Sequence, residues 1–196
     1  MRQSLVASLL MLAGLQLLQG CAAVAVGGIA GTVVMSQDRR TMGTITEDAG
    51  IELKSATRLG QTLKEGVHIN ATSYNRMLLL TGEVPDAAAR EEAESIARSV
   101  ENVRGVYNEL AVSGVSSYTA RSNDTLITSK VKTRVLDARK FSGLNIKVVT
   151  ENSVVYLMGL VRTEEANDAT EIARTTSGVQ KVVRVFEYID TEPVTK

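Results

Sequence analysis

The chain lacks most of the residues that build cross-links and catalytic centres: it has no tryptophan, one cysteine, one histidine and two prolines in 196 residues. One cysteine cannot close a disulfide within the chain, nor supply the thiolates of a structural zinc site or an iron–sulfur centre. Charge of one sign is not in excess either, because 22 Lys and Arg are balanced by 22 Asp and Glu. General nucleic-acid binding depends on neutralising phosphates, so that class is not expected. A content of 44% hydrophobic and 22% charged residues is typical of a globular chain.

The sequence contains no recognisable catalytic constellation. The one histidine, His68, precedes Ile69 in an alternating segment and is interpreted as a strand residue rather than a metal ligand or a general base. The serines have no second histidine that would activate them as nucleophiles. Two acidic groups fall where helices are expected to start and complement the helix dipole there; they are Glu91, Glu92 and Glu94, and Glu164, Glu165 and Asp168. We expect no enzyme, no cofactor, no metal site and no small-molecule substrate.

The N-terminus has the pattern of a secretory signal. Arg2 precedes an apolar run over 5–18, after which the chain reads Leu18-Gln19-Gly20-Cys21. These four residues resemble the bacterial lipobox, which implies that 1–20 is a signal peptide and that Cys21 becomes the lipidated first residue. Ala22 stands where an Asp implies inner-membrane retention, so the resemblance to lipoprotein sorting implies an outer-membrane anchor facing the periplasm. The alternative is an uncleaved anchor, since 5–35 is long enough to span a bilayer.

The rest of the chain is an internal repeat. Residues 75–84 match 152–161 at an offset of 77, with Asn, Leu, Gly and Val recurring in order. Residues 93–106 match 169–182 at an offset of 76, with Ala, Ile, Ala, Arg, Val and Val recurring. The predicted organisation is a lipidated cysteine and flexible tether over 21–47, a first module over 48–112, a linker over 113–123, a second module over 124–190 and a tail over 191–196.

Each module is expected to fold as helix, hairpin, helix and strand. In the second copy, Ile127, Val131 and Val135 recur at four-residue spacing behind Asn123-Asp124-Thr125, which offers helix-capping oxygens. The elements predicted there are a helix over 125–138, strands over 144–150 and 154–161 with a tight turn at 151–152, a helix opening at 163–165 that Gly178 ends, and a strand over 182–189. In the first copy they are a helix over 51–63, strands over 67–73 and 77–84, a helix over 87–100 and a strand over 106–112. The fold class is α+β, each module being a three-stranded sheet packed on two helices.

A run of residues in the second copy has the spacing of a known family. Gly159, Val161, Ala169, Ile172, Ala173, Arg174, Gly178, Val179 and Val182 resemble the BON domain, named after bacterial osmotically inducible and nodulation proteins. Two such domains behind a lipobox resemble the dual-BON outer-membrane lipoproteins. That resemblance implies a non-enzymatic lipoprotein whose second domain binds anionic phospholipid through its first helix, and which supports envelope integrity and gathers at division sites. Related proteins can carry an aromatic residue at the position of Leu126.

Positive charge is concentrated at the first helix of the second copy. Six cations lie between 130 and 147 against one acid, Asp137. On a helix, Leu126 points away from the core stripe together with Ser129, Lys130, Thr133 and Lys140. We predict a face that binds phosphatidylglycerol or cardiolipin: Leu126 inserts, Lys130, Lys132 and Lys140 meet headgroup phosphates, and Ser129 and Thr133 donate hydrogen bonds. Two alternatives stay open, a solvated charged face with one stray leucine, and docking of either domain onto an envelope protein.

Overall fold

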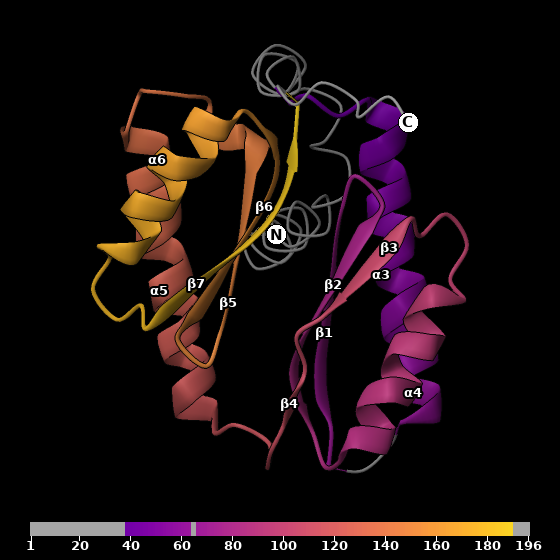
Figure 1. Cartoon of the computed structure of the whole chain (residues 1–196). Coiled ribbons are helices and arrows are strands. Elements are labelled where there is room, and N and C mark those ends of the chain that lie inside the picture. Colours follow the sequence, from indigo (N-terminus) through magenta and orange to yellow (C-terminus); the bar gives the residue numbers. More distant parts are fainter. Residues whose placement is uncertain (1–37, 64–65, 190–196) are drawn as a thin grey trace, which may run out of the picture. The chain divides into compact units, whose positions relative to one another are not determined.

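The computed structural model describes residues 38–63 and 66–189, which belong to one compact unit over 38–196 (Figure 1). The predicted signal peptide and Cys21 lie outside the described residues. Within the described residues, no helix combines the length and the apolar character needed to cross a membrane.

The first repeat is built around a central strand. Its elements are α3 (Met42–Thr62), β1 (His68–Tyr74), β2 (Met77–Val84), α4 (Ala87–Arg98), β3 (Gly105–Asn108) and β4 (Ala111–Val112). Strand β2 pairs antiparallel with β1 and parallel with both β3 and β4, so that the last two are one interrupted strand. The predicted strand over 106–112 is therefore broken at 109–110, where Leu110 turns its side chain into the core.

The second repeat has the same order of elements. They are α5 (Tyr118–Asp137), the short 3-10 helix η3 (Gly143–Asn145), β5 (Ile146–Glu151), β6 (Val154–Val161), α6 (Thr163–Arg174) and β7 (Lys181–Tyr188). Strand β6 lies between antiparallel β5 and parallel β7. In each repeat, both helices cover the same face of the sheet (Figure 1). The predicted α+β class, with two helices on a three-stranded sheet in each repeat, is confirmed.

The first helix of each repeat starts earlier than its apolar period predicts. Thr41 caps α3 by accepting a 3.1 Å hydrogen bond from the Thr44 N–H, and Ser117 caps α5 by accepting one of 3.2 Å from Ala120. Residues 42–47, predicted as tether, and 118–123, predicted as linker, are therefore helical. The predicted N-cap of the second copy at 123–125 is wrong, because those residues lie inside α5.

A buried aspartate in each first helix holds the hairpin turn of its own repeat. Asp124 accepts hydrogen bonds of 2.9 and 2.8 Å from the backbone N–H groups of Asn152 and Ser153. Asp48 does the same for Asn75 and Arg76, at 2.8 and 2.7 Å. These four turn residues have positive φ, which is uncommon outside glycine and asparagine. The turn predicted at 151–152 lies one residue later, since Glu151 still pairs with Val154 in the β5–β6 ladder.

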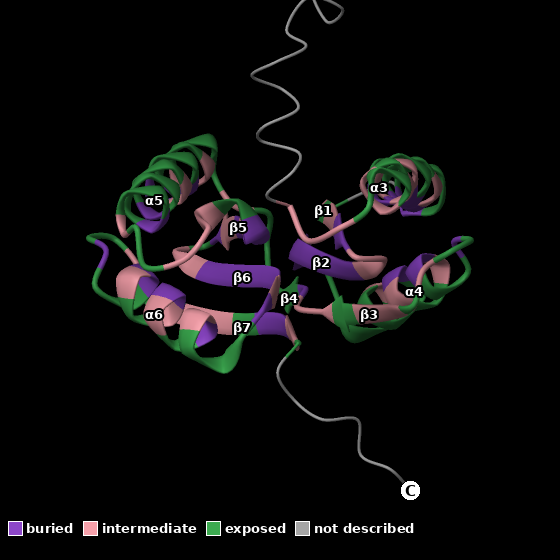
Figure 2. Cartoon of the chain, turned by 90° about the horizontal axis from the view of Figure 1, so that it is seen from above, coloured by how far each residue is buried: buried purple, intermediate pink, exposed green. Residues whose placement is uncertain are grey.

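Each repeat has its own core between helices and sheet. In Figure 2 the buried residues line the helix sides that face the strands, while the outer sides are exposed. The second core contains Ile127, Val131 and Val135 of α5 against Leu157 of β6. Because β2 is covered on both faces, Leu78, Leu79 and Leu80 are all fully buried. Burial of each such side chain contributes roughly 1.5–3 kcal/mol.

The faces of the two sheets that carry no helices share a third cluster. It contains buried side chains of both repeats, namely Tyr74, Leu79, Tyr156, Met158 and Val185. Polar contacts extend it, since Lys147 Nζ lies 2.6 Å from Glu52 Oε1 and Asn75 Nδ2 lies 2.9 Å from Glu187 Oε2. The two repeats are therefore packed on each other through an apolar centre with a polar edge.

The segment before α3 also contacts the second repeat. Arg39 donates to both carboxylate oxygens of Glu165, at 2.6 and 2.8 Å, and to the Leu160 carbonyl at 2.7 Å. This hydrogen bonding holds the pKa of Glu165 below its ordinary value, although burial opposes the effect. Arg40 lies over the ring of Tyr74 at 3.9 Å and pairs with Asp48. Burial raises the pKa of Tyr74 to about 12.

Candidate functional site

The outer face of α5 carries an exposed leucine. Ile127, Val131 and Val135 are at most 1% exposed, and their burial fixes which side of the helix faces solvent. Leu126 lies on that solvent side with 60% of its surface exposed. Ser129, Lys130 and Thr133 lie on the same side and are exposed as well. Besides Tyr118 at its start, the helix therefore exposes two large apolar side chains, Leu126 and Leu136, among polar ones.

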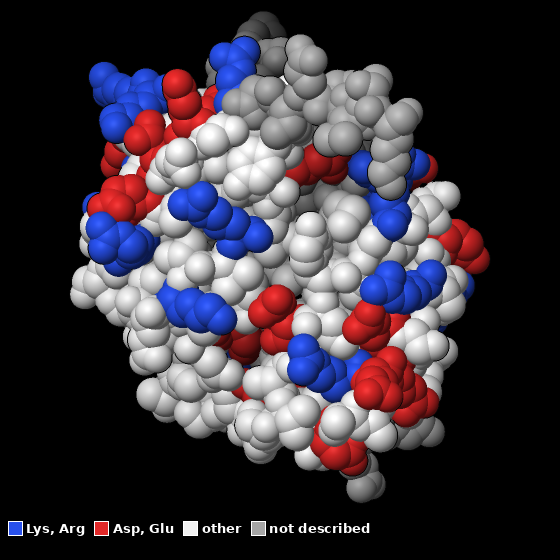
Figure 3. Space-filling model, in the orientation of Figure 1, with Lys and Arg blue, Asp and Glu red and all other residues white. Residues whose placement is uncertain are grey.

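This face borders an open groove of about 570 Å³ with a mainly apolar surface. Four of the predicted residues line it, Leu126, Ser129, Lys130 and Thr133. The remaining lining comes from Arg134 and from the residues that follow α6, Thr175, Thr176 and Ser177. In Figure 3, an area without charged side chains lies at the lower left, where Figure 1 places the loop between α6 and β7. Sequence reasoning missed the contribution of this loop.

Arg134 fixes the far wall of the groove. Its guanidinium donates to the Ile172 carbonyl at 2.8 Å and to the hydroxyls of Thr176 and Thr175 at 2.6 and 3.1 Å. A cation at the C-terminus of α6 satisfies carbonyls that have no partner within the helix. Arg134 is therefore engaged in joining α5 to α6. The contact spans about 40 residues of sequence, and no local pattern indicates it.

The predicted lysines fall into three environments. Lys130 borders the groove and forms no ion pair among the described residues. Lys132 also forms none there, but it lies on another flank of α5 and lines a different cavity, whose wall includes His68. Lys140 follows the helix and pairs with Asp168 at 3.1 Å. Both partners of that pair are exposed, so it contributes little and is easily exchanged. The structure thus brings together Leu126, Ser129, Lys130 and Thr133, with Lys132 and Lys140 at a distance from the groove.

One predicted hydrogen-bond donor is already used. The Ser129 hydroxyl donates to the Thr125 carbonyl at 3.0 Å, one turn earlier on α5. Its oxygen retains the capacity to accept, and a donated bond to a headgroup requires this internal bond to break. Lys130 is therefore the groove residue best placed to contact an anion.

The chain belongs to the BON domain family, whose pattern matches residues 47–114 and 123–190. It is 39% identical over 175 residues to the outer membrane lipoprotein DolP of Haemophilus influenzae, covering 88% of this chain and 91% of that protein. A 21 kDa hemolysin of Actinobacillus pleuropneumoniae is 34% identical, with 78% and 79% covered. The osmotically inducible protein Y of Escherichia coli is 28% identical, with 72% of each chain covered.

These relationships confirm the family expected from the sequence and carry two consequences. By homology the chain is an outer-membrane lipoprotein, and it belongs to a class of non-enzymatic modules. Of the acids predicted at helix starts, Glu164 and Glu165 do lie in the first turn of α6. The prediction is wrong for the others, because the first turn of α4 contains no acid and Asp168 lies further along α6, where it pairs with Lys140.

Proposed function

We propose that this chain is anchored through a lipidated Cys21 and binds the anionic phospholipids phosphatidylglycerol and cardiolipin through the outer face of α5. The observation that carries the proposal is the 60% exposed side chain of Leu126 at the rim of a mainly apolar groove, beside Lys130, which forms no ion pair with any residue that the structure describes. Leu126 enters the acyl boundary of the leaflet, and Lys130 meets a headgroup phosphate. Thr133 supplies a hydrogen bond at the groove, and Ser129 contributes when its internal bond opens. The hydroxyls of Thr175 and Thr176 already bond α6 carbonyls and Arg134, and they shape the groove wall.

The expected strength of this contact is modest. Burying a leucine gains roughly 1.5–3 kcal/mol, and each cation near an anionic leaflet adds about 1 kcal/mol. With Leu126 and the three lysines Lys130, Lys132 and Lys140, the gross gain is roughly 4.5–6 kcal/mol, which corresponds to dissociation constants of about 0.04–0.5 mM. A free domain therefore binds weakly, and the anchor at Cys21 raises the effective lipid concentration enough to hold it on the membrane.

Sedimentation with liposomes tests the proposal. A soluble form lacking residues 1–21 is mixed with millimolar vesicles of zwitterionic lipid, with and without phosphatidylglycerol or cardiolipin. Leu126→Glu and Lys130→Glu are each expected to reduce binding to anionic vesicles several-fold. The matched controls are Leu53→Glu and Lys54→Glu on α3, since Leu53 is 71% exposed on the first repeat. Equal binding by the α5 variants and the wild type rules out this face.

The proposed biological consequence is support of envelope integrity, with accumulation at division sites. In this account the α5 contact directs an already anchored protein to membrane regions rich in anionic lipid. A fluorescent fusion carrying Leu126→Glu is then expected to remain in the outer membrane and to lose its accumulation at division sites. Unchanged accumulation separates localisation from lipid binding.

A further inference from the structure

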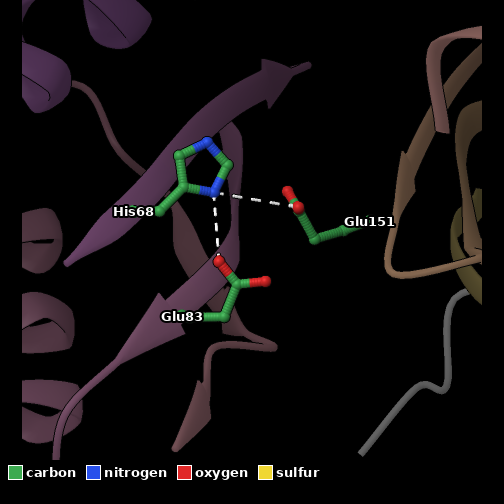
Figure 4. Close-up of side chains that lie close together, drawn as sticks. All are labelled: His68, Glu83 and Glu151. Atoms are coloured by element: carbon green, nitrogen blue, oxygen red, sulfur yellow. Dashed lines mark hydrogen bonds and ion pairs between the residues drawn. The ribbon is translucent and has the colours of Figure 1, made fainter. Parts of the chain in front are cut away.

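His68 and two glutamates converge where the two repeats meet (Figure 4). His68 lies on β1 and Glu83 on β2, while Glu151 ends β5 of the second repeat. His68 Nδ1 is 3.2 Å from Glu83 Oε2 and 3.8 Å from Glu151 Oε1. The two glutamate side chains are 1% and 7% exposed, and that of His68 is 20% exposed. The cluster is therefore nearly enclosed and contains groups from both repeats.

Each carboxylate is held in orientation by a hydrogen bond to its outer oxygen, the one that does not face His68. Glu151 Oε2 accepts a 2.9 Å hydrogen bond from the amide of Asn70, and Glu83 Oε1 accepts one of 2.6 Å from the amide of Asn152. The inner oxygens, Oε1 of Glu151 and Oε2 of Glu83, face the same histidine nitrogen. The backbone N–H of Ser116 also donates to Glu83 Oε2, at 3.2 Å. Hydrogen bonds of this kind to the outer oxygens fix ligand orientation in protein metal sites.

The charge in this cluster is not balanced. Within the part of the chain that the structure describes, neither Glu83 nor Glu151 forms an ion pair with a lysine or an arginine. Two cations, Arg121 and Lys132, line the adjoining cavity, and Arg121 donates to the Ser116 carbonyl and stacks on Tyr118. Two buried carboxylates with one histidine require a further cation or a proton, because an uncompensated buried charge is costly. A single N–H on Nδ1 cannot form a strong hydrogen bond to both inner oxygens at once.

We propose that His68, Glu83 and Glu151 bind a divalent transition-metal ion such as Zn²⁺, which joins the two BON domains. One ligand atom from each residue lies within 4.8 Å of the others. A tetrahedral zinc ion with bonds of about 2.0–2.2 Å holds its ligands about 3.3–3.6 Å apart. The distances from His68 Nδ1, 3.2 and 3.8 Å, are close to this spacing, and the two glutamate oxygens, which lie within 4.8 Å of each other, draw together when the ion binds. One nitrogen and two carboxylate oxygens are a ligand set that zinc and its neighbours accept.

The site has access for a fourth ligand. A cavity of about 340 Å³ has His68 and Glu151 in its wall, together with Asn70, Asp124 and Thr150. Water entering through this cavity completes a tetrahedral shell. The hydroxyl of Ser116, whose N–H already binds Glu83, is buried and has no hydrogen-bond partner among the described residues.

The neighbours of His68 in space are not those that its sequence position indicates. His68 does lie on a strand, as predicted, but its carboxylate neighbours come from a paired strand and from the other repeat. Glu83 is 15 residues away in sequence and belongs to the opposite strand of the hairpin. Spacing rules for metal motifs do not detect ligands that two domains supply jointly.

Metal titration of the full chain in detergent, free of affinity tags and stripped of metal, tests this site. Calorimetry with ZnCl₂ is expected to show one equivalent per chain. Zinc at 100-fold above its dissociation constant is expected to raise the melting temperature by about 5–10 °C. His68→Gln and Glu151→Gln are expected to weaken zinc binding by more than about 100-fold, and Asn70→Ala, which leaves all three ligands, by about 10-fold.

The matched control is Glu187→Gln, which removes another carboxylate between the repeats and is expected to bind zinc as the wild type does. Circular dichroism of each variant without metal establishes that it is folded. Absence of heat and of a melting shift at 1 mM zinc overturns the proposal and favours a shared proton in the cluster. Zinc binding that survives both His68→Gln and Glu151→Gln in folded protein also overturns it.

Discussion

Asp124 of α5 accepts a 2.9 Å hydrogen bond from the backbone N–H of Asn152, at the turn between β5 and β6. Asp124 is only 5% exposed, and its carboxylate also accepts a 2.8 Å hydrogen bond from the backbone N–H of Ser153. The same arrangement in the first repeat links Asp48 to Asn75 and Arg76. Each repeat thus ties its first helix to its hairpin through a buried acid.

Asp124→Ala is expected to destabilise the protein by about 2–4 kcal/mol, because two partly buried N–H groups lose their acceptor. Asp124→Asn keeps one acceptor oxygen and is expected to recover part of that loss. Urea unfolding measures both variants against the wild type. Unfolding of Asp124→Ala at the wild-type midpoint contradicts a structural role for this contact.

Two glycine substitutions are expected to have opposite effects. A Cβ at Gly82 would lie 1.9 Å from the His68 carbonyl oxygen, at a φ of +116°, so Gly82→Ala forces β1 and β2 apart. We expect a loss of about 3 kcal/mol or more. Gly60→Ala in α3 meets nothing within 4 Å and is expected to add about 0.5–1 kcal/mol. Thermal unfolding of both variants beside the wild type measures these effects. Equal melting temperatures for the two variants contradict the prediction.

The pair formed by Arg39 and Glu165 makes stability depend on pH. The pKa of Glu165 is lowered in the folded state by Arg39, so the unfolded chain binds the proton more readily. The contribution is complete above the ordinary carboxyl pKa of about 4.5 and is lost as pH falls through the lowered value. Arg39→Gln is expected to cost about 1–3 kcal/mol at pH 7.

Urea unfolding of the wild type and Arg39→Gln from pH 7 to pH 3 checks the sign. The difference between the two proteins is expected to shrink below about pH 4, leaving the part due to the Leu160 carbonyl. A difference that grows as pH falls is incompatible with this pairing.

The local pattern predicted most of the fold. The central strand over 154–161 and the start of α6 at 163 agree with the structure, because apolar runs and first-turn acids are local signals. The start of α5 could not be predicted in this way. Asp124 has the residue type of a helix cap, but in the structure it lies inside α5 and accepts hydrogen bonds from the hairpin turn. For the candidate site, helical geometry grouped Leu126 with Ser129, Lys130 and Thr133. The groove wall formed by 175–177 could not be predicted, because it depends on how α6 packs against α5, and the periodicity of one helix does not specify that packing.

A photoreactive residue at position 126 separates lipid binding from docking onto an envelope protein. In isolated envelopes we expect adducts with phospholipid that decrease when anionic lipid is depleted. The same probe at Leu53 is expected to give few lipid adducts. Adducts at 126 with a single protein, independent of lipid composition, support the docking alternative and contradict the proposed function.

The absence of tryptophan makes one fluorescence measurement a direct test of the central claim, insertion of the side chain at 126 into an anionic membrane. Leu126→Trp gives a single reporter on the outer face of α5, and Leu53→Trp gives the matched reporter on α3. On addition of vesicles containing phosphatidylglycerol, emission from Leu126→Trp is expected to move to shorter wavelength and to be quenched by brominated acyl chains, while Leu53→Trp stays unchanged. Unchanged emission from Leu126→Trp at millimolar anionic lipid contradicts the account.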